Sequence, residues 1–104
     1  MAGQVLTEVS AIVPPDREGE LVTAYRELVA GPLPEGLLRT ELLSGRDGRW
    51  RIQTLWRNRA ALDAMRAAAP EGPAAPRLFR AVGADPELAV LDVRACLVAS
   101  SEPG

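Results

Sequence analysis

The sequence contains no histidine, no lysine and a single cysteine, Cys96. Histidine and cysteine supply most nitrogen and sulfur ligands of zinc, copper and haem iron, so their scarcity argues against a transition-metal site. One cysteine cannot form an internal disulfide bond, and without lysine the Schiff base that usually holds pyridoxal phosphate cannot form. We therefore predict a protein that works without a metal and without an organic cofactor.

Two further absences limit the partners of the chain. The 14 acidic and 12 basic residues are interspersed without a basic run, which argues against a nucleic-acid partner. No apolar stretch approaches the roughly 20 residues that cross a bilayer, and the N-terminus lacks the basic and apolar regions of a signal peptide. We expect a cytoplasmic protein with no membrane partner.

The length and the hydrophobic content of the chain suffice for one small domain. The 104 residues are 47% hydrophobic, and this length is near the lower end of the size at which a core can hold a fold together unaided. We assign residues 1–98 to a single domain and residues 99–104 to a disordered tail. At this size, association with a second copy is a reasonable expectation.

Alternating apolar residues predict strands at residues 4–13, 37–44, 49–56 and 87–98. Apolar residues at helical spacing predict a helix between a cap at Asp16 and Gly31, a second helix after a cap at Asn58, and a short helix at residues 76–82. The short link at residues 45–48 is a hairpin signal. This β-α-β-β-α-β order predicts an α+β, ferredoxin-like fold, in which helices cover one face of an antiparallel sheet.

The alternation also separates the two faces of the predicted sheet. One set is apolar and should lie under the helices: Val5, Val9, Leu38, Leu42, Trp50, Ile52, Trp56, Leu91 and Val93. The other face is polar but is interrupted by large apolar side chains: Leu6, Ile12, Leu37, Leu43 and Leu55. Because this is too much apolar surface for a solvated sheet face, we predict that it meets the same face of a second copy in a homodimer.

The third predicted strand carries both tryptophans of the chain, Trp50 and Trp56. They share the two-residue period of a strand and should point into one buried layer. Residues 52–65 read IQTLWRNRAALDAM, and residues 76–82 read PRLFRAV. These segments resemble the antibiotic biosynthesis monooxygenase family, whose strand-ending tryptophan precedes a polar cap and an Ala-Leu helix, and the likeness spans residues 4–98.

In that family two sheets close face to face, and each subunit holds its ligand between sheet and helices. The resemblance therefore implies a dimeric α+β barrel that binds a small aromatic molecule. One branch oxidises polycyclic phenols to quinones without a metal or a flavin. The resemblance implies that Trp56 matches the strand-end tryptophan of that branch, and that Arg77 or Arg80 matches the arginine of its late helix.

Other positions of the family pattern differ in this chain. The Asn, Tyr and His positions of the quinone-forming branch fall on Ile52, Leu62 and a residue near Leu43. The haem-degrading branch has an asparagine, an aromatic residue and an axial histidine, where this chain has about Val9, Met65 and no histidine. We therefore exclude haem degradation. Without histidine, a base would have to be a carboxylate with a raised pKa, a water molecule or nothing.

We predict a cofactor-independent monooxygenase that oxidises a polycyclic phenolic, polyketide-like substrate in secondary metabolism. The expected catalytic residues are Trp56, Arg77 and Arg80, and the expected substrate-binding residues are Trp50, Tyr25, Ile52, Leu62, Met65 and Phe79. Two alternatives stay open: an oxygen-independent polyketide cyclase and a non-catalytic binding protein on the same fold. In a purely structural interpretation the tryptophans fill the core, the tyrosine lies at its edge and the arginines are solvated.

Overall fold

The computed structural model describes residues 3–99. In chain order the elements are β1 (Val5–Ile12), the 3-10 turn η1 (Pro15–Arg17), α1 (Glu18–Ala30), β2 (Leu37–Ser44), β3 (Arg49–Trp56), α2 (Arg59–Ala67), α3 (Ala74–Ala81) and β4 (Glu87–Asp92). The tail predicted at residues 99–104 lies outside the described residues, apart from Ala99. None of the described helices is both long enough and apolar enough to cross a bilayer.

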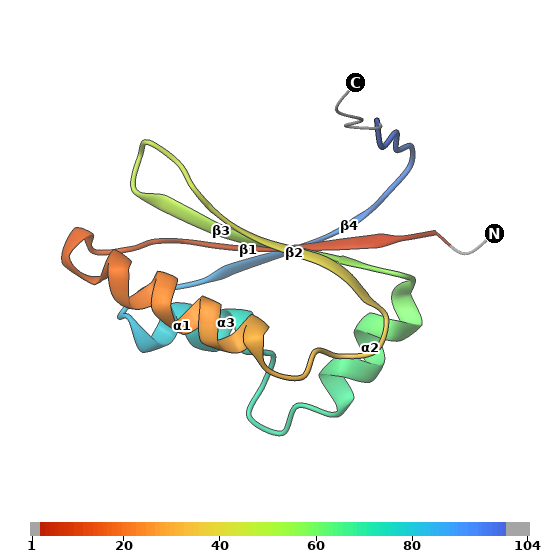
Figure 1. The fold of residues 1–104 in the computed structure, drawn as a ribbon, viewed down its shortest axis with the longest axis horizontal. Coiled ribbons are helices and arrows are strands. Elements are labelled where there is room, and N and C mark those ends of the chain that lie inside the picture. Colours follow the sequence, from red (N-terminus) through yellow and green to blue (C-terminus); the bar gives the residue numbers. More distant parts are fainter. Residues whose placement is uncertain (1–2, 100–104) are drawn as a thin grey trace.

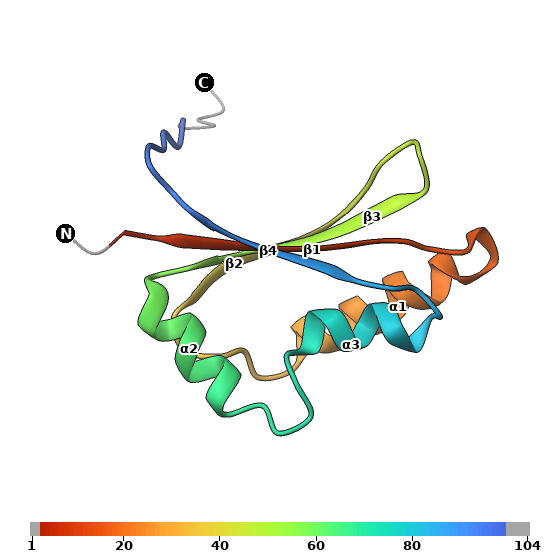
Figure 2. The ribbon, with the colours of Figure 1, turned by 180° about the vertical axis from the view of Figure 1, so that it is seen from behind.

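The strands form one antiparallel sheet in the order β2-β3-β1-β4. The helices cover one face of this sheet, and the opposite face carries none of the described helices (Figure 1, Figure 2). Helices α1 and α3 pack against each other, while α2 lies apart from them, beside the end of β3. The predicted α+β, ferredoxin-like fold is confirmed.

Two helix starts were predicted from capping residues, and one of them is wrong. Asn58 caps α2, because its Oδ1 accepts a hydrogen bond of 2.9 Å from the Ala61 backbone N–H. Asp16 caps nothing, because Pro15 opens a 3-10 turn that the Arg17 N–H closes by donating to the Pro14 carbonyl. Helix α1 therefore begins only at Glu18.

Two predicted boundaries also shift. Helix α3 begins at Ala74, ahead of Pro76, because a helix tolerates proline in its first turn, where the backbone N–H needs no partner within the helix. Strand β4 ends at Asp92 and does not continue to residue 98 as predicted. The residues that follow have no regular structure, and Leu97 is 90% exposed.

The predicted sheet faces are correct for β1 and β3 but not for β4. Leu91 lies opposite Leu6, so it points to the face without helices and is 49% exposed. Val90 lies opposite Thr7 and points toward the helices instead. Val93 comes after the strand has ended. Residues 88–91 are apolar at both alternate sets of positions, so alternation alone could not fix which side chains face inward.

In β2 the error has a different cause. The pairing with β3 is irregular between Leu37 and Arg39, so Leu38 is the extra residue of a β-bulge. Leu37 lies opposite Trp56 and packs on the helix side, whereas Leu38 is 47% exposed. The predicted positions of these two leucines are therefore exchanged, because a bulge shifts every residue before it to the other face.

The buried side chains divide into two clusters on the helix side of the sheet. The larger cluster lies under α1 and α3, and its members are Val9, Ala11, Val13, Leu21, Ile52, Phe79, Val82 and Ala84. The smaller cluster lies between the sheet and α2, and its members are Val5, Trp56, Ala61 and Leu62. The two tryptophans thus share a sheet face but belong to different parts of the interior.

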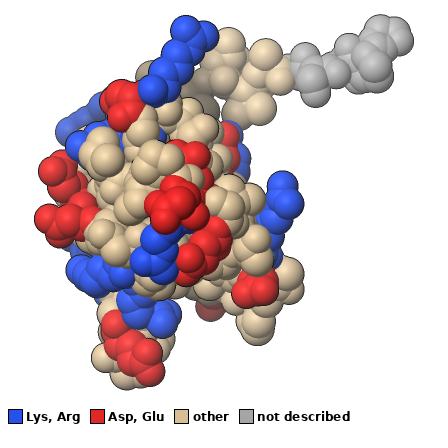
Figure 3. All heavy atoms as spheres, turned by 90° about the vertical axis from the view of Figure 1, so that its left-hand side faces the viewer, with Lys and Arg blue, Asp and Glu red and all other residues tan. Residues whose placement is uncertain are grey.

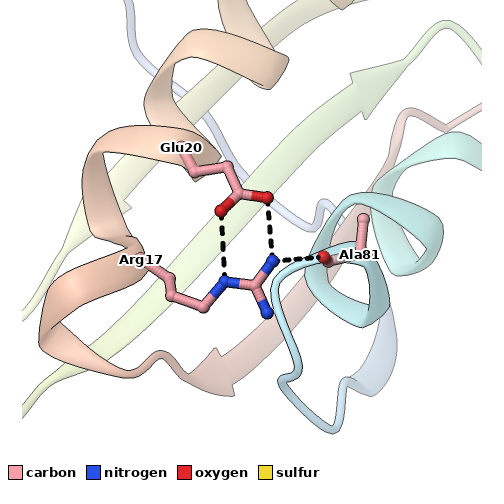
Figure 4. Close-up of polar contacts among 3 residues, drawn as sticks. All are labelled: Arg17, Glu20 and Ala81. Atoms are coloured by element: carbon pink, nitrogen blue, oxygen red, sulfur yellow. Dashed lines mark hydrogen bonds and ion pairs between the residues drawn. The ribbon is translucent and has the colours of Figure 1, made fainter.

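Arg17 joins η1 to the end of α3. Its guanidinium donates 3.1 Å and 2.8 Å hydrogen bonds to the two carboxylate oxygens of Glu20, and a third of 2.9 Å to the Ala81 carbonyl (Figure 4). The carbonyls in the last turn of a helix lack partners within the helix, so this contact satisfies one of them. On this end of the molecule basic and acidic side chains intermingle, without a patch of one sign (Figure 3).

The sheet face without helices combines paired polar groups with bare apolar ones. Glu8 accepts a 2.8 Å hydrogen bond from Gln53 and lies 3.9 Å from the Arg51 guanidinium. Beside them, Leu6 lies opposite both Leu55 and Leu91, so the three form an apolar row across β3, β1 and β4. These three polar groups are paired within the chain, and none of the described helices covers the apolar row beside them.

We expect the protein to be a dimer in solution that associates through this row. Leu91→Glu should convert it to a monomer, because an unpaired charge at a closed interface is costly. Leu88→Glu is the matched control: the same strand carries it, it is 51% exposed, and it points to the helix side. Light scattering coupled to size-exclusion chromatography gives the masses. A wild-type monomer, or equal effects of the two substitutions, would contradict the prediction.

We expect Arg17→Ala to lower the midpoint of thermal unfolding more than Arg59→Ala does. Among the described residues Arg59 pairs with Asp63 alone, one turn away at 3.2 Å, so its loss disconnects no distant elements. The Arg17 guanidinium holds the pKa of Glu20 below its ordinary value of 4.5. Their attraction is therefore present above pH 4.5 and is lost as the pH falls, so the difference between the variants should shrink in acid. Differential scanning fluorimetry at several pH values measures it.

Candidate ligand-binding cavity

A cavity of about 460 Å³ lies between the helices and the covered face of the sheet. This volume falls within the range of small-molecule sites. Most of its lining is apolar, and it separates the two buried clusters: Val9 and Ile52 come from the larger one, Trp56 and Leu62 from the smaller one. The cavity thus fills the space that α2 leaves by lying apart from the α1–α3 pair.

Local sequence explains why this space stays open. Helix α1 ends at Ala30 with Gly31 as its C-cap, and Pro32 and Pro34 line the cavity in the loop that follows. Proline cannot continue a helix, so the chain turns away before it could fill the gap. Gly36 then adopts a φ of 87° against α2, where any side chain would collide with Ala61. The start of α2 is therefore held close to β2, and its remaining turns line the cavity.

A row of hydroxyl groups crosses the otherwise apolar inner sheet face. The Tyr25 hydroxyl donates a 3.1 Å hydrogen bond to Thr40 Oγ1, which lies 3.2 Å from Thr54 Oγ1 in a further hydrogen bond. The Trp56 indole N–H donates a 3.1 Å bond to Thr7 Oγ1, and the Thr7 hydroxyl donates a 3.4 Å bond to the Thr54 carbonyl. All five residues line the cavity.

Two arginines line the cavity from the helices. Arg77, on α3, donates a 3.1 Å hydrogen bond to the Gly72 carbonyl and lies 3.7 Å from the Glu71 carboxylate. Its side chain is 48% exposed, so it connects the cavity with solvent. Arg66, on α2, is half-buried and also belongs to the lining. Either guanidinium can donate charge-assisted hydrogen bonds to an anionic group on a ligand.

The structure brings together six of the predicted site residues and separates three. The residues that line the cavity are Trp56, Tyr25, Ile52, Leu62, Met65 and Arg77. Trp50 lies near the start of α1, where its indole N–H donates a 3.2 Å hydrogen bond to Glu18. Phe79 is fully buried in the larger cluster, and the exposed Arg80 is not part of the lining.

Sequence reasoning missed Arg66 and assigned no role to Thr7, Thr40 and Thr54. A signal for two of the threonines was present. Thr7 and Thr54 each take an inward position in an apolar alternation, Val5-Thr7-Val9 and Ile52-Thr54-Trp56, and a buried hydroxyl needs a partner. Arg66 follows Leu62 by one helical turn, which places it on the same side of α2.

The cavity lining of the described chain includes no aspartate, glutamate, histidine or cysteine. The carboxylates with lowered pKa values lie elsewhere: Glu20 pairs with Arg17, and Asp47 accepts a hydrogen bond from the Arg49 backbone N–H in the β2–β3 hairpin. Within residues 3–99 no three acidic, histidine or cysteine side chains gather as a metal site would require. Chemistry in this cavity therefore has hydroxyl, indole and guanidinium groups to work with.

Neither a protein-family model nor a curated protein sequence matches the chain. Solved structures do match it. A Deinococcus radiodurans protein, a candidate antibiotic biosynthesis monooxygenase, superimposes with a TM-score of 0.71 at 14% identity, over 93% of this chain and 99% of that one. The chain has the fold of the antibiotic biosynthesis monooxygenases. The predicted resemblance is confirmed at the level of the fold.

Two functionally described proteins share this fold. SnoaB of Streptomyces nogalater, a cofactor-independent oxygenase, matches with a TM-score of 0.61 at 18% identity, over 92% of this chain and 98% of that one. The haem degrader MhuD of Mycobacterium tuberculosis, solved with two haems in its active site, matches with a TM-score of 0.67 at 23% identity, over 90% and 99%. At such identities the likeness establishes the fold alone.

The indole of Trp56 is oriented by Thr7, and we expect this bond to be measurable. Thr7→Val keeps the shape but leaves the buried indole N–H without its acceptor, which should cost about 1–3 kcal/mol of unfolding free energy. In a Trp56→Phe background the same substitution should cost much less, because no N–H is left unpaired. Urea unfolding of the wild type, both single variants and the double variant gives the coupling. Equal costs in both backgrounds would contradict this role of Thr7.

Proposed function

We propose that the cavity binds a polycyclic phenolic, polyketide-like compound and that the protein oxidises it with molecular oxygen, without a cofactor. The observation that carries the proposal is the apolar cavity of about 460 Å³ that Trp56, Arg66 and Arg77 help to line. Flat rings fit a site with apolar walls and a few convergent polar groups. The fold shared with a cofactor-independent oxygenase supports the same class of reaction.

In this reaction the substrate supplies the electrons. A ring methylene between aromatic rings loses two hydrogens and takes one atom of O2 as a carbonyl oxygen, while the other oxygen atom leaves as water. Deprotonation comes first, since the electron-rich anion is the species that reduces oxygen. The protein has to hold that anion and keep bulk water away from it.

The cavity offers groups for the first of these tasks. The guanidinium of Arg77 can stabilise a phenolate by charge-assisted hydrogen bonds, with Arg66 contributing positive charge from α2. Trp56 provides a flat wall against which an aromatic ring can stack. Because no carboxylate or imidazole lines the cavity within the described residues, the proton passes to water or to the solvent, and acidic substrates need the least assistance.

The test is oxygen uptake by the purified protein with a panel of anthrone-like and naphthol-like phenols, with product masses from the same reactions. We expect uptake together with a product that has gained one oxygen atom and lost two hydrogens. Trp56→Phe should lower the rate at least about tenfold, because the ring would be held less well for reaction. Arg77→Gln should lower kcat/KM about tenfold, the effect of one partly solvated charged hydrogen bond.

The chain provides matched controls for both substitutions. Trp50→Phe makes the same change on the same strand and sheet face, but outside the cavity lining. Arg80→Gln makes the same change on α3, also outside the lining. Both should leave the rate near that of the wild type. If the controls reduce the rate as much as the cavity variants do, the loss reflects stability, and this cavity is not the site.

The absence of a carboxylate from the lining also fits chemistry that depends on positioning alone, as in ring closure by a polyketide cyclase. Conversion of substrate at the same rate under nitrogen would replace the oxygenase by this second function. Ligand binding without turnover, in air and in nitrogen, would instead identify a binding protein on the same fold.

A further inference from the structure

We propose that the hydroxyl pair of Thr40 and Thr54 selects ligands that carry a hydrogen-bond-accepting oxygen, a ring ketone or a phenolate, on a flat ring system. The inference rests on the proposed function, because it names the ligand group that the same cavity recognises. The evidence for it is that the hydroxyl groups of Tyr25, Thr40 and Thr54 have one more hydrogen than the hydrogen bonds among them use.

Three hydroxyl hydrogens belong to Tyr25, Thr40 and Thr54. The hydrogen of Tyr25 is used in its bond to Thr40 Oγ1. Thr40 and Thr54 share one further bond, in which either can be the donor, so this bond uses one of their two hydrogens. Whichever threonine donates, the hydrogen of the other has no acceptor among the described residues, and both threonines line the cavity.

Among the described residues, no hydrogen bond joins the neighbouring hydroxyl of Thr7 to Thr40 Oγ1 or Thr54 Oγ1. Thr7 Oγ1 accepts from the Trp56 indole and donates its own hydrogen to the Thr54 carbonyl. Around the threonine pair the cavity walls are apolar side chains, among them Ile52 and Val9. A ligand that displaces solvent from this region must accept the hydrogen or leave it unpaired. Leaving a buried donor unpaired is costly, so sites of this kind reject ligands that lack the acceptor.

The first experiment compares 9-fluorenone with fluorene, which share a flat ring system and differ by a carbonyl in place of a methylene group. Neither a turnover assay nor oxygen is needed. Equilibrium dialysis, with each ligand below its solubility and the protein in excess, gives the two dissociation constants. We expect the wild type to bind the ketone about threefold to tenfold more tightly, the worth of one neutral hydrogen bond.

Two variants test whether the threonine pair causes the preference for the ketone. Tyr25→Phe/Thr40→Val/Thr54→Val replaces these three hydroxyl-bearing side chains by apolar ones of similar shape, so it leaves no unpaired partner among them and should bind both compounds about equally. Tyr25→Phe alone is the matched control: it also removes a hydroxyl from the row, but one hydrogen of the threonine pair is still left over. This variant should keep the wild-type preference. Fluorene binding reports in each case that the cavity is intact.

Equal binding of the two compounds by the wild type would overturn the inference without any variant. So would a preference that persists in the triple variant, or one that disappears in Tyr25→Phe while fluorene still binds. These outcomes are separate from the proposed reaction. A ketone preference without oxygen uptake by phenols would support selection by the threonine pair and contradict the oxygenase. Oxygen uptake without the ketone preference would support the oxygenase and contradict selection by the threonine pair.

Discussion

The position of α2 depends on a contact that only glycine permits. Gly36 holds a positive φ and lies so close to Ala61 that a side chain there would collide with it, while its carbonyl accepts a 2.8 Å hydrogen bond from the Arg57 N–H. The start of β2, the end of β3 and the first turn of α2 are thereby tied at one point. From this point Leu62 packs beside Trp56, and α2 is kept away from the other two helices. The cavity is the space that results.

The two buried clusters consequently have different roles. The cluster under α1 and α3 contains most of the fully buried side chains, among them Phe79 and Leu21, and carries the packing that a small domain needs. The cluster under α2 is smaller, and its Trp56 packs within the cluster and also lines the cavity. A hydroxyl row crosses the sheet between the two clusters, and all but one of its hydroxyl hydrogens are donated within the described chain. In small-molecule sites generally, a few polar groups orient the ligand and apolar walls provide most of the contact area.

Sequence patterns predicted the fold well because β1 and β3, the central strands, alternate cleanly, and because Asn58, Gly31 and the prolines mark the helix ends. These patterns failed where the inward and outward positions of a strand were equally apolar, as around Leu91. They also failed where a bulge at Leu38 shifted the register. The site was partly predictable for the same reason. Residues around Trp56 line the cavity together, but Trp50, six positions earlier on the same face, lies about 20 Å along the strand. Periodicity identifies a face, and it does not say which part of that face is hollow.

A cavity of about 460 Å³ has a consequence for how long the protein persists in a cell. Apolar walls in contact with water do not contribute the burial free energy that packed neighbours would supply, so they stabilise the fold less than a filled core would. A compound that occupies the hollow binds the native chain and not the unfolded one, so it raises stability in proportion to the logarithm of its concentration. Proteases act mainly on unfolded chains. A compound that binds in the cavity would then raise the steady-state amount of this protein without any change in transcription.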